Sequence, residues 1–388
     1  MNRTPLIIIG VGGFLILVTV LVLAGILPGA RTSKPQPVTI EMWGVQDSDE
    51  DWRGVLRAFH EVKPHIAINY QEFSEDNYEQ ELINKLAEGK GPDVFMLKNS
   101  WVQKHGSKVI PMPVKTLAID PQAISRAFID IFRQDLVSQE GGIIGLPLYV
   151  DAPALFYNKD IFNSAGIAEL PQTWDEVLEI SKKLTQKASG GSITRSGLTL
   201  GTFQNVEYAF EILNSVMLQN GSAILDLREK KVTLGQEAEL AIEFYASFAN
   251  PKSANASWNS RFKPSLDALA EGDAAMAFGM ARDIERLSKK NPHLNFGVLP
   301  FPQPRDGKTR AVYGTYFFPA VSRSSKNPLA AWEFILFASS RNGANAYLAS
   351  TNRVPARRDI LGQGTVREKL DPFYRQILSA QSWPVPDD

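Results

Sequence analysis

The sequence predicts an α/β protein of two lobes that follow an apolar N-terminal segment. Patterns typical of strands and helices alternate along most of the chain, and its 388 residues are enough for two or three domains of about 100–200 residues each. Hydrophobic residues make up 44% of the sequence and charged residues 21%, which is ordinary for globular proteins. This composition excludes a mainly disordered chain.

The first strand–helix–strand unit begins at Val38. Residues 38–43 alternate between apolar and polar side chains, which is the period of a strand. Apolar residues then recur at helical spacing over 52–62, Pro64 ends that pattern, and Ile66–Tyr70 reads as a second strand. A strand, a helix and a strand in this order imply a parallel sheet covered by helices.

The rest of the chain continues in the same way. We expect a helix over about Asp76–Glu88 and a short buried strand at Val94–Leu97. Thr173 and Glu176 form a capping box that opens another helix. The other helices are expected to begin near Gln204, Gln236, Ser265 and Asn327, and the other strands are expected at Ile143–Val150, Ala154–Tyr157, Ala274–Phe278, Asn295–Val298 and Tyr316–Val321.

The N-terminus contains a long segment without charge. The 22 residues Leu6–Leu27 would span about 33 Å as a helix, enough for the hydrocarbon core of a bilayer. We therefore expect 1–28 to be one N-terminal transmembrane helix that anchors the protein. A cleaved secretory signal is the alternative, because Val22–Ala24 resembles a weak cleavage site. Residues 29–37, rich in proline, form an expected linker.

Composition and motifs exclude several classes of function. The 41 basic and 42 acidic residues leave a net charge of −1, so there is no basic surface for nucleic acid. The absence of cysteine excludes disulfides, thiolate metal sites and a cysteine nucleophile. No Walker phosphate loop and no Gly-x-Ser-x-Gly nucleophile motif is present.

Two apparent metal motifs fail on spacing. His60 and His65 are five residues apart, which puts them on different faces of a helix, and Pro64 breaks the helix between them. The acidic run that starts at Asp47 lacks the glycine and the final glutamate of a calcium loop, so it reads as acids at a helix N-terminus. We expect no metal and no cofactor.

The tryptophans separate into two groups. Trp52, Trp174 and Trp332 fall on the apolar faces of expected helices and are assigned to the core. Trp43 ends the first strand and Trp101 follows the Val94–Leu97 strand, and ligands of open α/β sheets bind beyond the carboxyl ends of strands. Packing between the lobes is the alternative for both. An aromatic ring offers a flat apolar face to a sugar ring. Polar neighbours that would bind the sugar hydroxyls are Gln46, Asp47, Asn99 and Ser100.

Four motifs together carry a family resemblance. They are Gly145–Asp160 with the Pro171–Glu176 helix start, Gly91–Phe95, Gly272–Met276, and Ser325–Pro328 with Ala331–Phe334. In these motifs, and in their order along about Val38–Arg358, the sequence resembles the extracellular solute-binding proteins of family 1, the sugar-binding partners of ABC transporters.

The resemblance implies a type II periplasmic-binding-protein-like fold, in which two α/β lobes close on a ligand about hinge crossovers. By position, the crossovers are Leu146–Asp151 and Val312–Phe317. The implied lobes are 38–147 with about 318–338, and 148–317 with about 339–388.

The resemblance also implies a ligand cleft. The residues carried over to it are Trp43, Gln46, Asp47, Asn99, Ser100, Trp101, Tyr149, Asp151, Met280, Arg282, Tyr313 and Tyr316. Two departures stand out. Many relatives carry a sugar-stacking tryptophan after the Ala275–Met276 pair, but Gly279–Arg282 contains none, and the lipidated cysteine common in the family is missing.

The resemblance implies a monomeric, membrane-tethered, extracytoplasmic receptor that delivers a carbohydrate to an ABC permease and catalyses no reaction. A secreted glycosidase that uses cleft carboxylates such as Asp47 and Asp151 is one alternative, since such enzymes need two carboxylates side by side. A sensor subunit with the same binding fold is another. Arg282 would equally suit a phosphorylated or acidic ligand.

Overall fold

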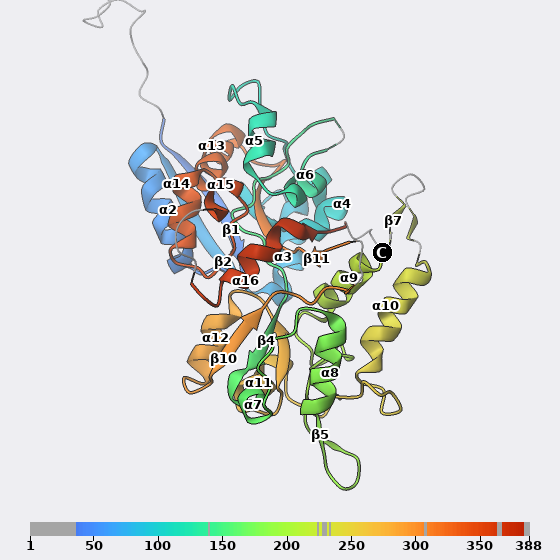
Figure 1. Ribbon diagram of the computed structural model, residues 1–388. Helices are drawn as coiled ribbons and strands as arrows, with labels where there is room; N and C mark the ends of the chain where they lie inside the picture. The colour runs from blue at the N-terminus through green and yellow to red at the C-terminus, as the bar shows by residue number, and fades with distance from the viewer. Residues whose placement is uncertain are drawn as a thin grey trace, which may run out of the picture. The chain divides into compact units, whose positions relative to one another are not determined.

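The computed structural model describes residues 36–138, 140–222, 225–226, 231–232, 234–305, 309–362 and 367–383 (Figure 1). Internal contacts divide the chain after Val38, and the described helices all lie in the unit Thr39–Asp388. The expected membrane segment, Leu6–Leu27, lies outside the described residues. Within the described residues, no helix is long and apolar enough to cross a bilayer.

The first lobe is built on a four-stranded sheet in the order β12-β3-β1-β2. β1 (Val38–Val45) runs parallel to β3 (Val94–Lys98), as the strand–helix–strand pattern predicts. β2 (Ile66–Phe73) forms one edge. The other edge is β12 (Phe317–Val321), which comes from a distant part of the chain and lies antiparallel to β3.

The helices of this lobe follow their apolar spacing. α2 (Asp49–Val62) buries Trp52, Val55 and Phe59, whereas Val62 is 62% exposed and lies off the predicted apolar face. The buried residues recur at intervals of three and four, so one face of the helix points to the core.

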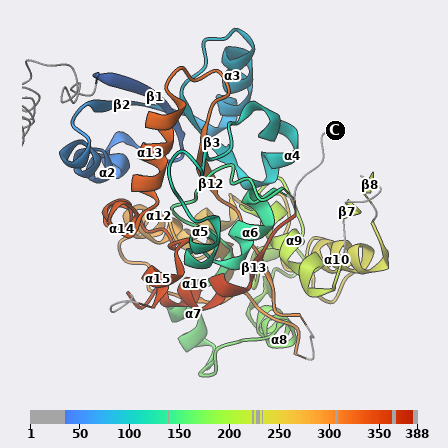
Figure 2. The same ribbon diagram turned by 90° about the horizontal axis from the view of Figure 1, so that it is seen from above.

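Two C-terminal helices also belong beside this sheet. α13 (Pro328–Ala338) contacts β12, and α14 (Arg341–Leu348) contacts α2 and α13. Figures 1 and 2 both show α13 and α14 next to α2. The sequence predicts 339–388 in the second lobe, whereas these contacts favour placing α14 in the first. The other lobe boundaries stay predictions.

The second lobe contains a three-stranded sheet in the order β10-β4-β9. β4 (Ala154–Asn158) is central and pairs antiparallel with β9 (Met276–Gly279) and β10 (Phe296–Leu299). All three strands lie within two residues of their expected positions. This sheet is antiparallel, because its strands come from distant parts of the chain and not from consecutive strand–helix–strand units.

The capping box at Thr173 is confirmed and opens α8 (Trp174–Leu184). The backbone N–H of Glu176 donates to Thr173 Oγ1 at 3.4 Å, and Glu176 Oε2 accepts the Thr173 N–H at 3.0 Å. α9 (Ala209–Gln219) begins later than expected from Gln204, because Tyr208 has a left-handed backbone conformation (φ 59°) that a helix interior does not accept.

The two predicted crossovers lie side by side. Asp151 and Thr315 exchange two backbone hydrogen bonds of 2.9 Å each. A third segment joins them, since the Val150 N–H donates to Val354 O at 2.9 Å. The expected strand Ile143–Val150 is absent, because its residues pair with other segments only at isolated positions.

The remaining elements are mostly short. They are α3 (Glu75–Ala87), α4 (Val102–His105), α5 (Pro121–Ala127), α6 (Asp130–Leu136), α7 (Lys159–Ser164), α10 (Gln236–Ser247), α11 (Ser265–Glu271), α12 (Asp283–Lys290), α15 (Arg358–Leu361), α16 (Asp371–Gln376), β5 (Gln186–Lys187), β6 (Ile193–Arg195), β7 (Leu225–Asp226), β8 (Lys231–Val232), β11 (Val312–Tyr313), β13 (Ala380–Gln381) and the 3-10 turns Asn99–Trp101, Gly106–Lys108 and Ile377–Ser379.

The core tryptophans are where the sequence places them. Trp52, Trp174 and Trp332 are 1%, 8% and 0% exposed. Trp258 is also buried, stacked on Phe262 at 4.6 Å, although its polar sequence context gave no sign of this.

We expect Trp332→Ala to lower the free energy of unfolding by about 3–5 kcal/mol, because it leaves a cavity beside β12. It also removes the indole hydrogen bond to Ile110 O (3.2 Å). Urea unfolding measures the loss. Leu329→Ala is the control on the same helix: Leu329 is 46% exposed, so its loss should cost no more than about 0.5 kcal/mol. Equal losses would contradict this assignment of the core.

Candidate ligand-binding site

A cavity of about 160 Å³ lies where both lobes meet the crossovers. Three groups of residues line it. Gln46, Glu75 and Lys98 come from the first lobe, Tyr208, Glu211, Met280 and Arg282 from the second, and Tyr149, Asp151, Thr315, Tyr316 and Phe317 from the crossovers and the start of β12. Six of the twelve predicted site residues are therefore brought together: Gln46, Tyr149, Asp151, Met280, Arg282 and Tyr316.

The other six predicted residues do not line this cavity. Asp47, Asn99, Ser100 and Tyr313 are buried. Trp43 packs on Phe73, with ring centres 4.3 Å apart. Trp101 lies next to the cavity, edge-on to Phe317 at 5.7 Å. Their direct contact with a ligand stays a prediction.

A buried arginine that the sequence analysis missed organises the site. Arg353 is 4% exposed and donates to Asp47 Oδ1 at 3.0 Å through Nη2, and to Asp151 Oδ2 through Nη1. Nη2 also lies 3.4 Å from Gln46 Oε1, and the guanidinium stacks 4.2 Å from the centre of the Tyr149 ring. Burial alone would lower the pKa of Arg353, but Asp151 and its other partners raise it well above the ordinary value, so the guanidinium stays charged.

One carboxylate oxygen of Asp151 accepts a hydrogen bond and the other does not. Oδ2 accepts from Arg353, whereas Oδ1 is buried without a hydrogen-bond partner in the described part of the chain. Asp151 lines the cavity, while its Oδ1 atom is itself shielded from solvent. An unpaired buried acceptor costs about 1–3 kcal/mol or more, so a ligand hydroxyl that donates to it would recover that free energy.

Two cavity residues hold strained backbone conformations. Among the described residues, Gln46 (φ 68°), Ala118 and Tyr208 (φ 59°) are the non-glycine residues in the left-handed region. Gln46 and Tyr208 both line the cavity, one from each lobe. Such conformations cost about 1–3 kcal/mol and cluster at functional sites, where they fix side-chain directions. Gln46 Nε2 is directed at Glu75 Oε2, 2.7 Å away.

The cavity mixes both signs of charge with aromatic hydroxyls. Arg282 Nε lies 3.4 Å from the Tyr208 hydroxyl, and Lys98 lies over the Phe317 ring at 5.9 Å. Burial raises the pKa of Tyr149 and of Tyr208, so both hydroxyls keep their protons and can donate as well as accept. The charged side chains of the lining are Glu75, Asp151, Glu211, Lys98 and Arg282.

A half-buried carboxylate, Asp135, is hydrogen-bonded to the cavity residue Tyr316. Its Oδ2 accepts from Asn99 Nδ2 at 3.0 Å and from the Tyr316 hydroxyl at 2.9 Å, and its Oδ1 accepts from the Ser382 hydroxyl. Asn99 Oδ1 in turn accepts the backbone N–H of Tyr316 at 3.2 Å. The predicted site residue Asn99 thus holds the cavity wall in place. Burial, only partly offset by these neutral donors, raises the pKa of Asp135 to about 6.

Other features gather fewer predicted residues. A larger open hollow of about 860 Å³ lies at the α7–α8 loop and includes none of the twelve. Within the described ranges, no group of three His, Asp or Glu side chains is arranged to hold a metal ion.

Known proteins resemble this chain in sequence over most of its length. The profile of the bacterial extracellular solute-binding proteins matches residues 44–345. The chain belongs to this family. A putative binding protein of Brucella abortus is 26% identical over 287 residues, which cover 73% of this chain and 67% of that protein. The galactooligosaccharide-binding protein of Bacillus subtilis is 25% identical over 308 residues, covering 77% and 68%.

Solved structures show the same fold. The sugar-binding protein MalE of Xanthomonas citri superposes with a TM-score of 0.73 at 20% identity, covering 89% of this chain and 87% of that one. The family assignment and this likeness establish a two-lobe, MalE-like solute-binding fold.

We expect Arg353→Met to destabilise the protein by about 3–5 kcal/mol, because it leaves two buried carboxylates without their cation. The free energy of unfolding in urea measures the loss. Arg53→Met is the control: Arg53 pairs with Glu50 on the surface, where both side chains are 68% exposed, so the change should cost about 1 kcal/mol or less. A small loss in Arg353→Met would contradict the role of the guanidinium.

Asp135 should also shape the pH dependence of stability. Its pKa is about 6 in the folded chain and about 3.9 when unfolded, so between these values the folded state binds more protons. Its contribution therefore falls as pH rises from about 4 to about 6 and is constant above. Relative to wild type, Asp135→Asn should gain about 2–3 kcal/mol over that range.

Urea unfolding at several pH values measures this difference. Asp130→Asn, an exposed carboxylate on the same helix, is the control for the loss of one charge. A difference between Asp135→Asn and wild type that does not change between pH 4 and 6 would refute the assignment.

Proposed function

We propose that the chain is the substrate-binding protein of an ABC importer and captures a neutral carbohydrate, a sugar or an oligosaccharide, between its two lobes. The observation that carries this proposal is the cavity itself, to which both lobes and the crossovers contribute polar and aromatic side chains. A ligand there touches both lobes only when they are closed. Binding therefore favours the closed state, and the permease recognises the closed state.

The chemistry of the lining supports a polyhydroxylated ligand. Carboxylates, amides and tyrosine hydroxyls provide donors and acceptors close together, and Phe317 provides an apolar face. Asp151 Oδ1 is a buried acceptor without a hydrogen-bond partner among the described residues. A hydrogen bond from the ligand to this atom would therefore be especially stabilising. The similarity to a galactooligosaccharide-binding protein and to MalE points to the same class of ligand.

The charges favour a neutral ligand over a phosphorylated one. Three carboxylates, Glu75, Asp151 and Glu211, face the same space as Lys98 and Arg282. Tyr208 already contacts one side of the Arg282 guanidinium, so fewer of its N–H groups are available to bind an anion. A doubly charged phosphate would meet more negative than positive charge.

The arrangement does not support the glycosidase alternative. Asp47 and Asp151, the carboxylates considered for it, are bound to one guanidinium, and Asp47 lies outside the cavity lining. An acid and a nucleophile must both reach the sugar. We infer a receptor that releases its ligand unchanged. A sensor subunit would bind its ligand at the same site and would differ only in the protein that it contacts.

We also propose that Leu6–Leu27 holds the protein at the outer face of the cell membrane, beside its permease. The support is the length and apolar character of the segment, together with a family of extracellular proteins. The receptor would act as a monomer. The proposed lobes are 38–147 with about 318–338 and α14, and 148–317 with the rest of the C-terminal segment.

A thermal-shift screen tests the function. A neutral sugar at about 100 times its dissociation constant should add about 2.7 kcal/mol of stability, whereas sn-glycerol 3-phosphate at the same concentration should add none. Asp151→Asn should weaken sugar binding about tenfold or more in calorimetry, because a charged acceptor is lost. Asp160→Asn, at the start of α7 and outside the cavity lining, is the matched control and should bind as wild type.

The sugar should be recovered chemically unchanged after long incubation with stoichiometric protein. If wild type produces hydrolysed sugar and Asp151→Asn does not, the protein is an enzyme and not a receptor. Stabilisation by the phosphate ester alone would contradict the neutral ligand.

A further inference from the structure

The carboxylate of Asp135 joins four parts of the chain, one of which lines the cavity. Asp135 lies on α6 and accepts from Asn99 in the turn after β3, from the Tyr316 hydroxyl in the crossover, and from the Ser382 hydroxyl in the C-terminal segment. Tyr316 lines the cavity, whereas Asp135 does not. Any effect of Asp135 on a ligand therefore passes through its hydrogen-bond partners.

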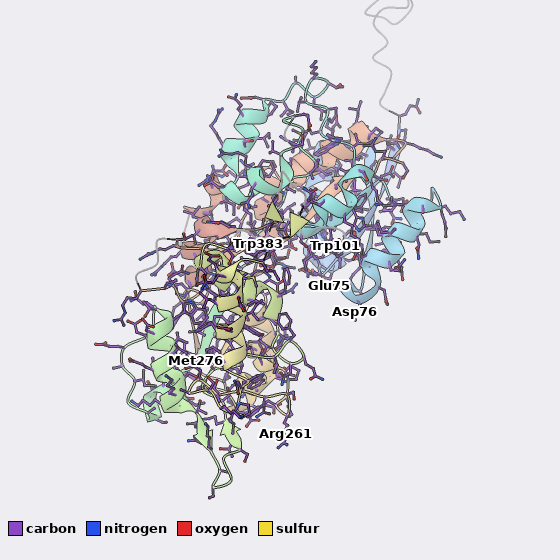
Figure 3. The ribbon with its side chains drawn as sticks, turned by 90° about the vertical axis from the view of Figure 1, so that its right-hand side faces the viewer. Glu75, Asp76, Trp101, Arg261, Met276 and Trp383 are labelled. Carbon is purple, nitrogen blue, oxygen red and sulfur yellow. The ribbon has the colours of Figure 1, made fainter. Side chains whose placement is uncertain are left out.

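The C-terminal segment extends this network from the first lobe to the second. Ser382 is held to α6 twice, since its hydroxyl donates to Asp135 and its carbonyl oxygen accepts from Gln134 Nε2. The next residue, Trp383, donates its indole N–H to Asn214 Oδ1 on α9 at 2.9 Å. Figure 3 labels Trp383 at the level where the two lobes meet. A change at Asp135 therefore reaches both the cavity wall and a contact between the lobes.

The ionised carboxylate satisfies each of its donors. Asp135 Oδ2 accepts from Asn99 and Tyr316, and Oδ1 accepts from Ser382. An ionised carboxylate only accepts, so three donors and two oxygens match without conflict. The backbone of Tyr316 is held as well, because Asn99 Oδ1 accepts its N–H at 3.2 Å. In this state the cavity wall is preorganised, which reduces the loss of conformational entropy when a ligand binds.

Protonation of Asp135 adds a fourth donor to the same cluster. Asn99 Oδ1 is already an acceptor for the Tyr316 N–H, and the Asn99 amide nitrogen cannot accept. Among the three described partners, the new O–H group can therefore donate only to the hydroxyl of Tyr316 or Ser382. That hydroxyl has to turn its own hydrogen away from Asp135. The protonated form thus loosens either the cavity wall or the contact of the C-terminal segment.

The groups that face Asp135 from other elements are uncharged. They include Tyr313 on β11, and burial together with the carboxylates of Asp135 and Glu211 raises the pKa of Tyr313, so this phenol keeps its proton. Burial likewise raises the pKa of Tyr316 well above its ordinary value. The hydrogen-bond partners among the described residues are the neutral donors Asn99, Tyr316 and Ser382.

The charged side chains on the neighbouring elements lie elsewhere. On α6, Asp130 and Arg133 pair with each other at the surface, where each is 66% exposed. Lys98 at the end of β3 and Glu211 on α9 both line the cavity. Burial raises the pKa of Asp135 to about 6, so its charge changes over a pH range in which binding experiments are practicable.

We propose that Asp135 is a positioning residue for ligand binding: the sugar binds to the form in which this carboxylate is ionised, and binding to the protonated form releases the proton to solvent. This inference rests on the proposed function and adds a proton-linked control of affinity to it. Linkage requires that ligand binding and proton release favour each other equally. A tenfold coupling gives about a fivefold loss of affinity between pH 7 and pH 5.

Titration calorimetry between pH 5 and pH 8 tests the coupling. The probes are maltose, galactobiose, mannobiose and chitobiose, and the sugar that binds wild type at pH 7.5 is used throughout. Its affinity should fall about fivefold from pH 7 to pH 5. Repeats near pH 5.5 in buffers that differ in ionisation enthalpy should show the release of about half a proton for each sugar bound.

Three variants separate this role from a purely structural one. Asp135→Asn stays neutral, so its affinity should not change between pH 7 and pH 5, and proton release should disappear. Ser382→Ala removes a donor that lowers the pKa of Asp135, so the midpoint of the affinity curve should move to higher pH. Asp130→Asn removes an exposed carboxylate from the same helix and should keep the wild-type pH profile.

Several outcomes would overturn the proposal. Sugar binding that is independent of pH and releases no proton would refute the coupling and leave the proposed function intact. A pH dependence that persists unchanged in Asp135→Asn would assign it to another group, such as Glu211. If Asp135→Asn does not fold, an unchanged midpoint in Ser382→Ala decides against the proposal. Failure of wild type to bind any of these sugars at pH 7.5 would remove the proposed function, and this inference with it.

Discussion

The buried guanidinium of Arg353 is the interaction on which the ligand site depends. It joins Asp47, which follows β1 in the first lobe, to Asp151 in the crossover. Either carboxylate alone would be costly to bury, so the three charges have to stay together. The guanidinium therefore ties the first lobe to the crossover, while the second lobe contributes Tyr208, Glu211, Met280 and Arg282 to the cavity.

The fold could be predicted largely because its signals are local. The alternation at 38–43 predicts β1, the spacing of Trp52 and Phe59 predicts the buried face of α2, and Thr173 with Glu176 predicts the start of α8. Each of these signals needs only a few neighbouring residues. The crossovers at Asp151 and Thr315 required the family resemblance, because no periodicity marks them.

The site was harder to predict because its interactions are distant in sequence. Arg353 lies 202 residues from Asp151 and 306 from Asp47, in a polar loop where an arginine is ordinarily exposed. Tyr208 and Glu211 gave no signal either, since the left-handed turn before α9 is not visible in composition. The position of Trp43 at a strand end predicts a sugar platform, and the structure adds that Phe73 packs against this ring, which no local pattern indicates. The contact of Trp43 with a ligand stays a prediction.

Asp151 both takes part in the buried ion pairs and lines the cavity, and this limits which residues can replace it. Oδ2 accepts from Arg353 and Oδ1 is buried without a partner among the described residues, so a substitution at this position disturbs the ion pairs and the cavity lining together. Met280 lines the same cavity without taking part in these ion pairs. A change at such a position can alter the ligand preference of the cavity while the charged centre stays intact.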